Sequence, residues 1–147
     1  TIENDEMGHG LDASLELEKH LALVMDIHHH WIRDEEYINA KDDRVKRVID
    51  SWRGQRPTMH YSYSRDEHLA PAGLGDKTHT EMHDIKMLLE RGCKKQKLRA
   101  HSDLLPNAKV NDWALSFGEH FDIQTEAKGK NIASEQLYRQ AVENSVI

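Results

Sequence analysis

Four short strand-like segments alternate with helical segments along this 147-residue chain, and the alternation restricts the folds open to it. Residues 21–25 form an unbroken apolar run, which is typical of a strand buried on both faces of a parallel sheet. The other predicted strands are residues 1–3, 58–62 and 121–126. Strands separated by helices predict a β/α architecture with a parallel sheet.

The segments between the strands carry helical patterns of apolar residues. The predicted helices cover residues 12–20, 43–52, 79–90, 110–119 and 131–144. Asp42 or Asp43 is the expected N-cap of the second helix. We expect residues 63–75 to form a loop and residues 93–99 to form a basic connection.

Side chains of the types that bind metals stand at the ends of the predicted strands. Glu3, Asp26, His60 and Glu126 lie within or at the carboxyl end of a strand, in a chain with 11 histidines and 26 acidic residues. That edge is where β/α barrels and open α/β sheets assemble their active sites. A buried carboxylate needs a partner. A bound divalent cation could provide it, and so could a neighbouring lysine or arginine.

The run Asp26-Ile27-His28-His29-His30 is the most concentrated candidate for a metal site. Asp26 ends a strand, and the loop expected after it can fold His28 or His29 back toward the same point. Carboxylates with neutral imidazoles suit zinc, manganese or iron. We expect His30 to be a solvated loop residue.

The remaining candidates are individually weaker. His60 lies within a strand, where a single histidine is more often a hydrogen-bonded core residue than a ligand. His101 lies in a loop. Glu126 and Lys128 alternate onto one face of the predicted strand, and the two side chains could also form a structural ion pair.

Composition excludes several classes of protein. The net charge of −6 argues against a simple basic nucleic-acid binder. No apolar run approaches the roughly 20 residues of a membrane helix, and no signal peptide opens the chain, so no membrane partner is expected. The single cysteine, Cys93, excludes an internal disulfide and favours a cytoplasmic location. Because the chain opens on a strand at Thr1, we expect it to be part of a longer protein.

Five motifs occur in an order that is similar to a known family. They are END at residues 3–5, DIHHHW at 26–31, RPTMHYS at 56–62, RAHSD at 99–103 and DIQTEAK at 122–128. Together they resemble the carboxyl-terminal half of the UV-damage endonuclease family, over nearly the whole chain. The resemblance implies a (β/α)8 TIM barrel similar to that of xylose isomerase. Residues 1–147 would supply its second half as four β/α units.

The resemblance also implies roles for individual positions. Metal binding would fall to Glu3, Asp26, His29, His60, His101 and Glu126. The catalytic set would be Glu3, Asp26, His60, Glu126 and Lys128. Lys128 matches a lysine that is a candidate for phosphate contact rather than metal binding. The chain departs from the family at Thr58, where the family usually carries a lysine.

The activity implied is that of a metal-dependent DNA repair endonuclease. It would nick the backbone 5′ to UV photoproducts or abasic sites, leaving a 3′-hydroxyl and a 5′-phosphate, with manganese favoured and zinc or magnesium as alternatives. The expected partners are damaged double-stranded DNA and an amino-terminal half of the barrel. The expected DNA contacts are Arg56, Arg65, Lys128 and Lys130. An abasic-site nuclease, a sugar isomerase of the same barrel superfamily and a non-catalytic metal-binding fragment remain the alternatives.

Overall fold

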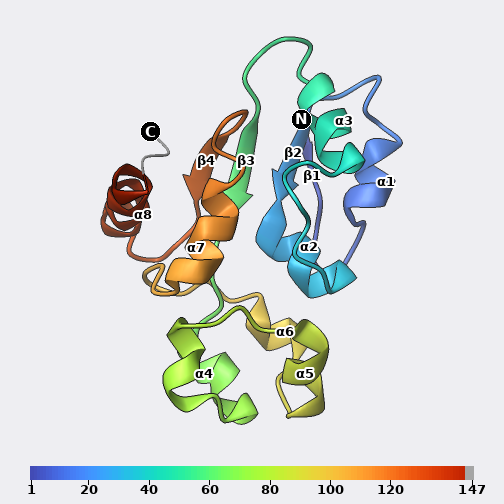
Figure 1. Cartoon of the computed structure of the whole chain (residues 1–147). Helices are drawn as coiled ribbons and strands as arrows, with labels where there is room; N and C mark the ends of the chain where they lie inside the picture. Colours follow the sequence, from blue (N-terminus) through green and yellow to red (C-terminus); the bar gives the residue numbers. More distant parts are fainter. Residues whose placement is uncertain (145–147) are drawn as a thin grey trace.

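The computed structural model describes residues 1–144 and contains a parallel sheet of four strands in those residues (Figure 1). The strands are β1 (Ile2–Glu3), β2 (Leu23–Asp26), β3 (Thr58–Tyr61) and β4 (Asp122–Thr125). They lie side by side in the order of the sequence. All four predicted strands and their parallel arrangement are therefore confirmed, with ends shifted by no more than two residues. A parallel sheet in sequential order fits part of a TIM-barrel type fold.

Helices connect the strands. Before β3 these are α1 (Leu11–Leu15), α2 (Ile27–Asp34) and α3 (Asp43–Asp50). Between β3 and β4 come α4 (Asp66–Leu69), α5 (Ile85–Glu90), α6 (Lys95–Leu98), α7 (Ala108–Leu115) and the 3₁₀ turns η1 (Ala70–Ala72) and η2 (Gly75–His79). The last helix is α8 (Asn131–Glu143). No helix in residues 1–144 combines the length and the apolar character needed to cross a bilayer.

Several predicted boundaries were wrong for local reasons. The helix expected over residues 79–90 begins only at Ile85, because the Asp84 side chain accepts a hydrogen bond from the Lys86 amide at 3.0 Å and caps it. The expected loop at residues 63–75 contains α4 and η1, and the basic connection contains α6. The predicted N-cap Asp42 is confirmed, since its side chain accepts from the Arg44 amide.

The two faces of the sheet differ in chemistry. Leu23, Met25, Met59 and Tyr61 are at most 1% exposed and belong to the hydrophobic core. Helices α1 and α3 pack against β2, and α8 packs against β4. Because strand side chains alternate between faces, the residues between these apolar ones point to the other face. Asp26 pairs there with His60, so that the two side chains share the polar face.

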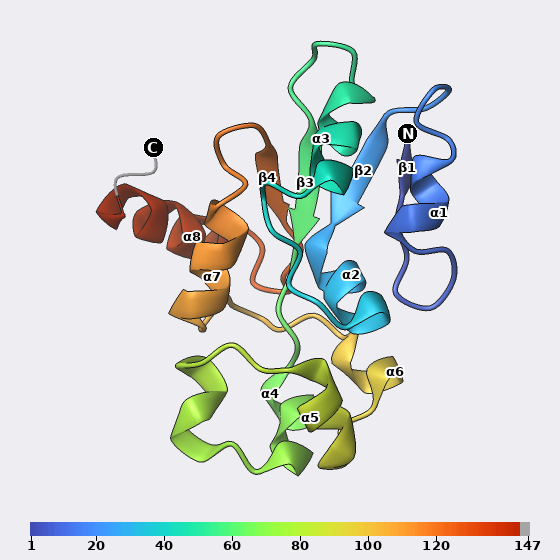
Figure 2. The ribbon, with the colours of Figure 1, turned by 45° about the vertical axis from the view of Figure 1, so that its right-hand side comes forward.

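The first part of the long connection from β3 to β4 forms a separate layer beyond the carboxyl ends of the strands, whereas α7 lies beside α8 (Figure 1). Figures 1 and 2 show α4, α5 and α6 gathered there, below the sheet. Leu69, Ile85, Leu88 and Leu98 are at most 2% exposed and form its interior. This layer places the loop at residues 99–104 next to the strand ends, where the candidate site lies.

Candidate metal centre

Four side chains of metal-binding type meet at the carboxyl edge of the sheet. Glu3, Asp26, His60 and Glu126 each offer one atom, and these atoms lie within 4.8 Å of one another. His60 Nδ1 is 3.0 Å from Glu3 Oε1 and 3.4 Å from Glu126 Oε1. Residues 3, 26, 60 and 126 lie at or next to the ends of β1, β2, β3 and β4 in turn. Parallel strands therefore bring together carboxylates that are 123 positions apart in the chain, since Glu3 and Glu126 are both members.

Asn4 fixes the ends of β1 and β2 against each other. Its Nδ2 donates to the Asp26 carbonyl oxygen at 2.9 Å, and its Oδ1 accepts from the Asp26 amide at 2.8 Å. Asn4 is 1% exposed, so this pair of bonds is shielded from water. The amide therefore holds the backbone of Asp26 in a defined position beside Glu3.

The histidine run lies on a helix and not on the loop expected from the sequence. The Asp26 carboxylate accepts from the His29 amide at 2.9 Å and is the N-cap of α2. Successive helical residues are about 100° apart, so the three histidines point in different directions. His28 is buried with Nε2 3.0 Å from Ser64 Oγ, and burial lowers its pKa to about 3. His28 is thus a neutral structural residue, and His29 is the member that faces the cluster.

His29 joins the four-residue cluster to a second group of ligands. Its Nδ1 is 2.7 Å from the Asn4 carbonyl oxygen, and its Nε2 is 3.4 Å from Asp26 Oδ2. The same Nε2 is 3.2 Å from Glu6 Oε2. Asp5, Glu6 and His29 also offer atoms within 4.8 Å of one another. The edge therefore has two adjoining groups that could hold cations, with His29 between them.

The sequence analysis gave Asn4 and Asp5 no role of their own, although both belong to the END motif, and it missed Glu6. The signal that could have found them is their position, since they follow Glu3 directly in a polar turn that closes through a hydrogen bond from the Asp5 amide to the His9 carbonyl. Arg99, the first residue of the RAHSD motif, contacts the second group of ligands. Its Nε lies 2.8 Å from Glu6 Oε1, and half of its side chain is exposed.

His101 lies beside this region but in neither group. Its ring stands edge-on to that of His28 at a centroid distance of 6.2 Å, and its backbone pairs with that of Ser64. Burial lowers the pKa of His101, which keeps the imidazole neutral, the form that binds metals.

The buried negative charge of the four-residue cluster indicates that a cation would fit there. Asp26 is fully buried, and its Oδ2 has no hydrogen-bond partner within residues 1–144. Burial and the neighbouring Glu3 and Glu126 carboxylates raise the pKa of Asp26 well above its usual value. The hydrogen bond to Glu3 raises the pKa of His60. Three carboxylates with one imidazole need positive charge, and such a donor set suits a divalent cation.

The structure brings some of the predicted basic residues to this edge. β4 ends at Thr125, so Glu126 and Lys128 lie on the loop after it, and the expected alternation on a strand face was wrong. The Glu126 amide instead donates to the Tyr61 carbonyl at 2.8 Å. Lys128 and Lys130 are exposed on this loop.

The two predicted arginines lie at opposite ends of the sheet. Arg65 contacts Asp103 at 3.2 Å and the His101 carbonyl at 3.4 Å, on the side of the candidate site. Arg56 pairs at 2.7 Å with Asp122, the first residue of β4. Arg56 therefore lies at the amino ends of the strands, away from the cluster.

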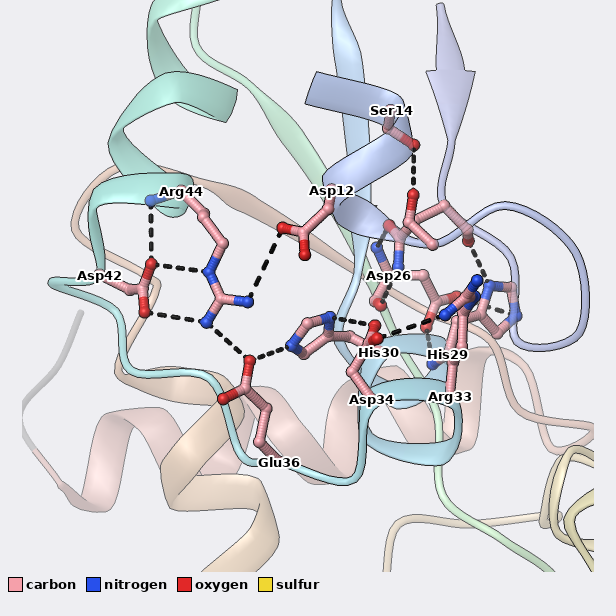
Figure 3. A network of polar contacts seen from close by, with 12 residues as sticks. Asp12, Ser14, Asp26, His29, His30, Arg33, Asp34, Glu36, Asp42 and Arg44 are labelled. Atoms are coloured by element: carbon pink, nitrogen blue, oxygen red, sulfur yellow. Dashed lines mark hydrogen bonds and ion pairs between the residues drawn. The ribbon is translucent and has the colours of Figure 1, made fainter. Parts of the chain in front are cut away.

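His30 is buried, contrary to the expectation of a solvated residue. Its Nε2 lies 2.6 Å from Glu36 Oε1, and its Nδ1 lies 3.1 Å from Asp34 Oδ2. Arg44 continues the network at 2.6 Å from the same Glu36 oxygen and also contacts Asp42 (Figure 3). The helical turn of α2 directs His30 into this network, which holds the segment between α2 and α3.

Replacing His30 with alanine should therefore affect stability and not metal binding. We expect the free energy of unfolding to fall by about 1–3 kcal/mol, because the hydrogen bond to Glu36 is lost and a cavity replaces the buried imidazole. The metal content measured by elemental analysis should stay at the wild-type value. His120→Ala is the control, since 59% of that side chain is exposed. A loss of metal in His30→Ala would contradict the structural role.

Comparison with known proteins gives one family match. The family model described as UV-endonuclease UvdE matches residues 1–146. No curated protein and no solved structure matches the chain.

Proposed function

The chain belongs to the UV-endonuclease UvdE family, and on that basis we propose that it supplies the catalytic metal site of an endonuclease acting on UV-damaged DNA. The reaction is hydrolysis of the phosphodiester 5′ to a photoproduct or abasic site, which leaves a 3′-hydroxyl and a 5′-phosphate. The observation that supports it best is the convergence of Glu3, Asp26, His60 and Glu126 at the carboxyl edge of the sheet. Parallel β/α folds assemble their active sites at that edge.

These four residues are proposed as ligands, together with His29 and His101. Divalent cations bound there supply the charge that stabilises the phosphodiester transition state and lowers the pKa of water. Manganese is favoured because the donor set mixes carboxylates with imidazoles, and zinc or magnesium is the alternative. Asp26 Oδ2, which has no hydrogen-bond partner in residues 1–144, is the atom for which a cation provides a ligand contact.

The role of the protein's own groups is to hold the ligands in place before substrate binds. The Asn4 side chain holds the backbone of Asp26, and the backbone amide of His29 donates to the Asp26 carboxylate. Glu3 orients the His60 ring through Nδ1 at 3.0 Å. Preorganised ligands avoid the cost of rearrangement during the reaction, which is the main contribution a protein makes at such a site.

DNA phosphates are proposed to bind the basic side chains around this edge. Lys128 and Lys130 are exposed on the loop after β4, and half of the Arg99 side chain is exposed near Glu6. Arg65 lies next to the same loops, whereas Arg56 at the other end of the sheet is not part of this surface.

Residues 1–147 are proposed to form the carboxyl-terminal half of an eight-stranded barrel. Four strands cannot close a barrel. The polar face of this sheet, which carries Asp26 and His60, would then line the barrel interior. The cytoplasmic location expected from Cys93 stays a prediction.

Replacing Lys128 with alanine should weaken DNA binding through the loss of one phosphate contact. We expect lower affinity for damaged and undamaged duplexes alike, and a slope of log K against log salt that is smaller by about 1. Fluorescence anisotropy at several salt concentrations measures both. Lys86→Ala is the matched control, because Lys86 is an exposed lysine of α5. An unchanged slope would remove Lys128 from the DNA-binding surface.

The decisive test compares substrates. The complete barrel protein, with the amino-terminal half present, is purified, stripped of metal and given Mn²⁺, and it is offered UV-irradiated plasmid, an abasic oligonucleotide and an aldose. We expect metal-dependent nicking of the irradiated plasmid. Cleavage of the abasic oligonucleotide alone would favour the abasic-site nuclease, and aldose conversion would favour the isomerase. Manganese binding with no reaction would favour a non-catalytic metal-binding protein.

A further inference from the structure

Two loops at the carboxyl edge are joined through their backbones. The loop after β4, residues 126–130, runs along residues 101–104 of the β3–β4 connection. The Lys128 amide donates to the Ser102 carbonyl at 3.0 Å, and the Gly129 amide donates to the Asp103 carbonyl at 2.7 Å. These bonds place one loop directly on the other.

Gly129 is the point of closest approach. A Cβ atom added there would lie 2.3 Å from the Asp103 carbonyl oxygen and 3.0 Å from Leu104 Cδ2. Gly129 is not among the residues with positive φ, so the backbone conformation itself does not demand glycine. Glycine is needed at this position because there is no space for a Cβ atom. The obstructing atom is a backbone oxygen, which no change of rotamer can move away.

The contact joins chain segments that carry functional groups. The loop at 126–130 carries Glu126 and Lys128, and the facing loop follows His101. The Ser102 amide donates in turn to the Tyr63 carbonyl, just after β3, at 2.8 Å. A backbone connection therefore runs from the end of β3, through residues 101–104, to the loop after β4.

We propose that Gly129 is a positioning residue, which lets the loop at 126–130 dock on the Asp103 carbonyl and so holds Glu126 and Lys128 in place for the metal ions and the DNA backbone. The inference rests on the proposed function. A side chain at this position pushes the two loops apart, and Glu126 then moves away from His60 and Asp26. Residues that orient metal ligands typically contribute 10–100-fold to metal affinity.

The test is the Mn²⁺ affinity of Gly129→Ala, measured by calorimetry below the melting temperature of the metal-free protein. We expect a loss of at least about 10-fold. Gly73→Ala is the control, because its φ is +65° but no atom lies within 4 Å of its added Cβ. It should lose stability and keep its affinity within about twofold. Equal losses in both variants, or an unchanged affinity in Gly129→Ala, overturn the inference. A wild-type protein that binds none of Mn²⁺, Zn²⁺ and Mg²⁺ overturns the proposed function as well.

Hydrogen exchange in the wild-type protein tests the same contact when Gly129→Ala does not fold. If docking of the loops favours metal binding, metal binding must favour docking by the same factor. Mn²⁺ is therefore expected to slow exchange of the Lys128 and Gly129 amides by at least about 10-fold. The Asp122 amide, which donates to Pro57 at the opposite end of the sheet, is the reference and should not change. No slowing of Lys128 and Gly129 overturns the inference.

Discussion

Replacing Asp26 with asparagine is expected to abolish tight metal binding and, in the same protein, to stabilise the metal-free fold. Asparagine has nearly the same shape and keeps an oxygen that can accept from the His29 amide, so the N-cap of α2 survives. What disappears is a fully buried carboxylate whose Oδ2 has no hydrogen-bond partner in residues 1–144. Glu3 and Glu126 lie beside it and repel its charge.

Both effects have expected sizes. Mn²⁺ affinity should fall by at least about 100-fold, since loss of a ligand exceeds the 10–100-fold cost of losing a group that only orients one. The free energy of unfolding of the metal-free protein should rise by about 1–3 kcal/mol, the usual penalty of an unsatisfied buried polar group. Elemental analysis and chemical denaturation in chelator measure the two quantities.

The stabilising effect should depend on pH in a defined direction. Burial and neighbouring carboxylates raise the pKa of Asp26 in the folded protein well above its usual value. A carboxyl group of this kind favours the folded state below its unfolded pKa and loses that contribution as pH rises through its folded pKa. The advantage of Asp26→Asn over the wild type should therefore grow from pH 4 toward neutral pH, because asparagine does not titrate.

The control for this experiment is Asp50→Asn, since Asp50 is exposed on α3. It should change neither metal affinity nor stability by a measurable amount. If the metal-free Asp26→Asn protein were less stable than the wild type, Asp26 would be a structural partner in this cluster and not an unpaired ligand.

Replacing Glu126 with glutamine in the complete barrel protein is expected to reduce nicking of UV-irradiated plasmid by about 10²–10⁴-fold, the range found when a catalytic group is removed. The glutamine keeps the length of the side chain. The amide at residue 126 still donates to the Tyr61 carbonyl and the Gly129 amide to the Asp103 carbonyl, so these contacts together keep the loop after β4 in place. Lys128 is unchanged, and DNA affinity should remain within a fewfold of the wild type. The loss should therefore fall on kcat rather than on KM.

The matched control is Glu119→Gln, because 84% of the Glu119 side chain is exposed. It should nick at the wild-type rate. His60→Ala provides an independent check, since His60 Nδ1 contacts both Glu3 and Glu126. Unchanged cutting by Glu126→Gln and His60→Ala together would remove this cluster from the reaction.

The strands and their terminal acids were predictable because the sequence pattern contains the reason for them. An apolar run such as residues 21–25 is typical of a strand that packs on both faces, as in a parallel sheet. In the structure Leu23 and Met25 are buried on one face, Val24 is half-buried, and Leu21, which precedes β2, is 37% exposed. In a parallel sheet the carboxyl ends of all strands meet at one edge. The sequence pattern therefore predicts that Glu3, Asp26 and His60 lie close together.

The histidine run was wrongly predicted to be a loop, because the start of α2 depends on a single hydrogen bond to the N-cap residue Asp26. The same five residues could continue as a loop or begin a helix, and the bond from the His29 amide to Asp26 decides for the helix. That choice turns His29 toward the cluster and buries His30 against Glu36. Arg56 was likewise predicted to contact DNA. Its ion pair with Asp122 forms only because β3 and β4 lie side by side, and the sequence pattern does not show it.

The sequence by itself therefore determined the alternation of strands and helices and the residues at the strand ends. The spacing of apolar residues and the order of the strands are properties of the linear sequence. Only the tertiary structure decided how those residues are held: the Asn4 clamp on Asp26, the second group at Glu6, and the close approach of Gly129 to Asp103. Each of these joins positions more than 20 residues apart or depends on the direction of a single side chain in space. Such distances have no counterpart in a linear pattern, because they are set by how the strands and loops pack.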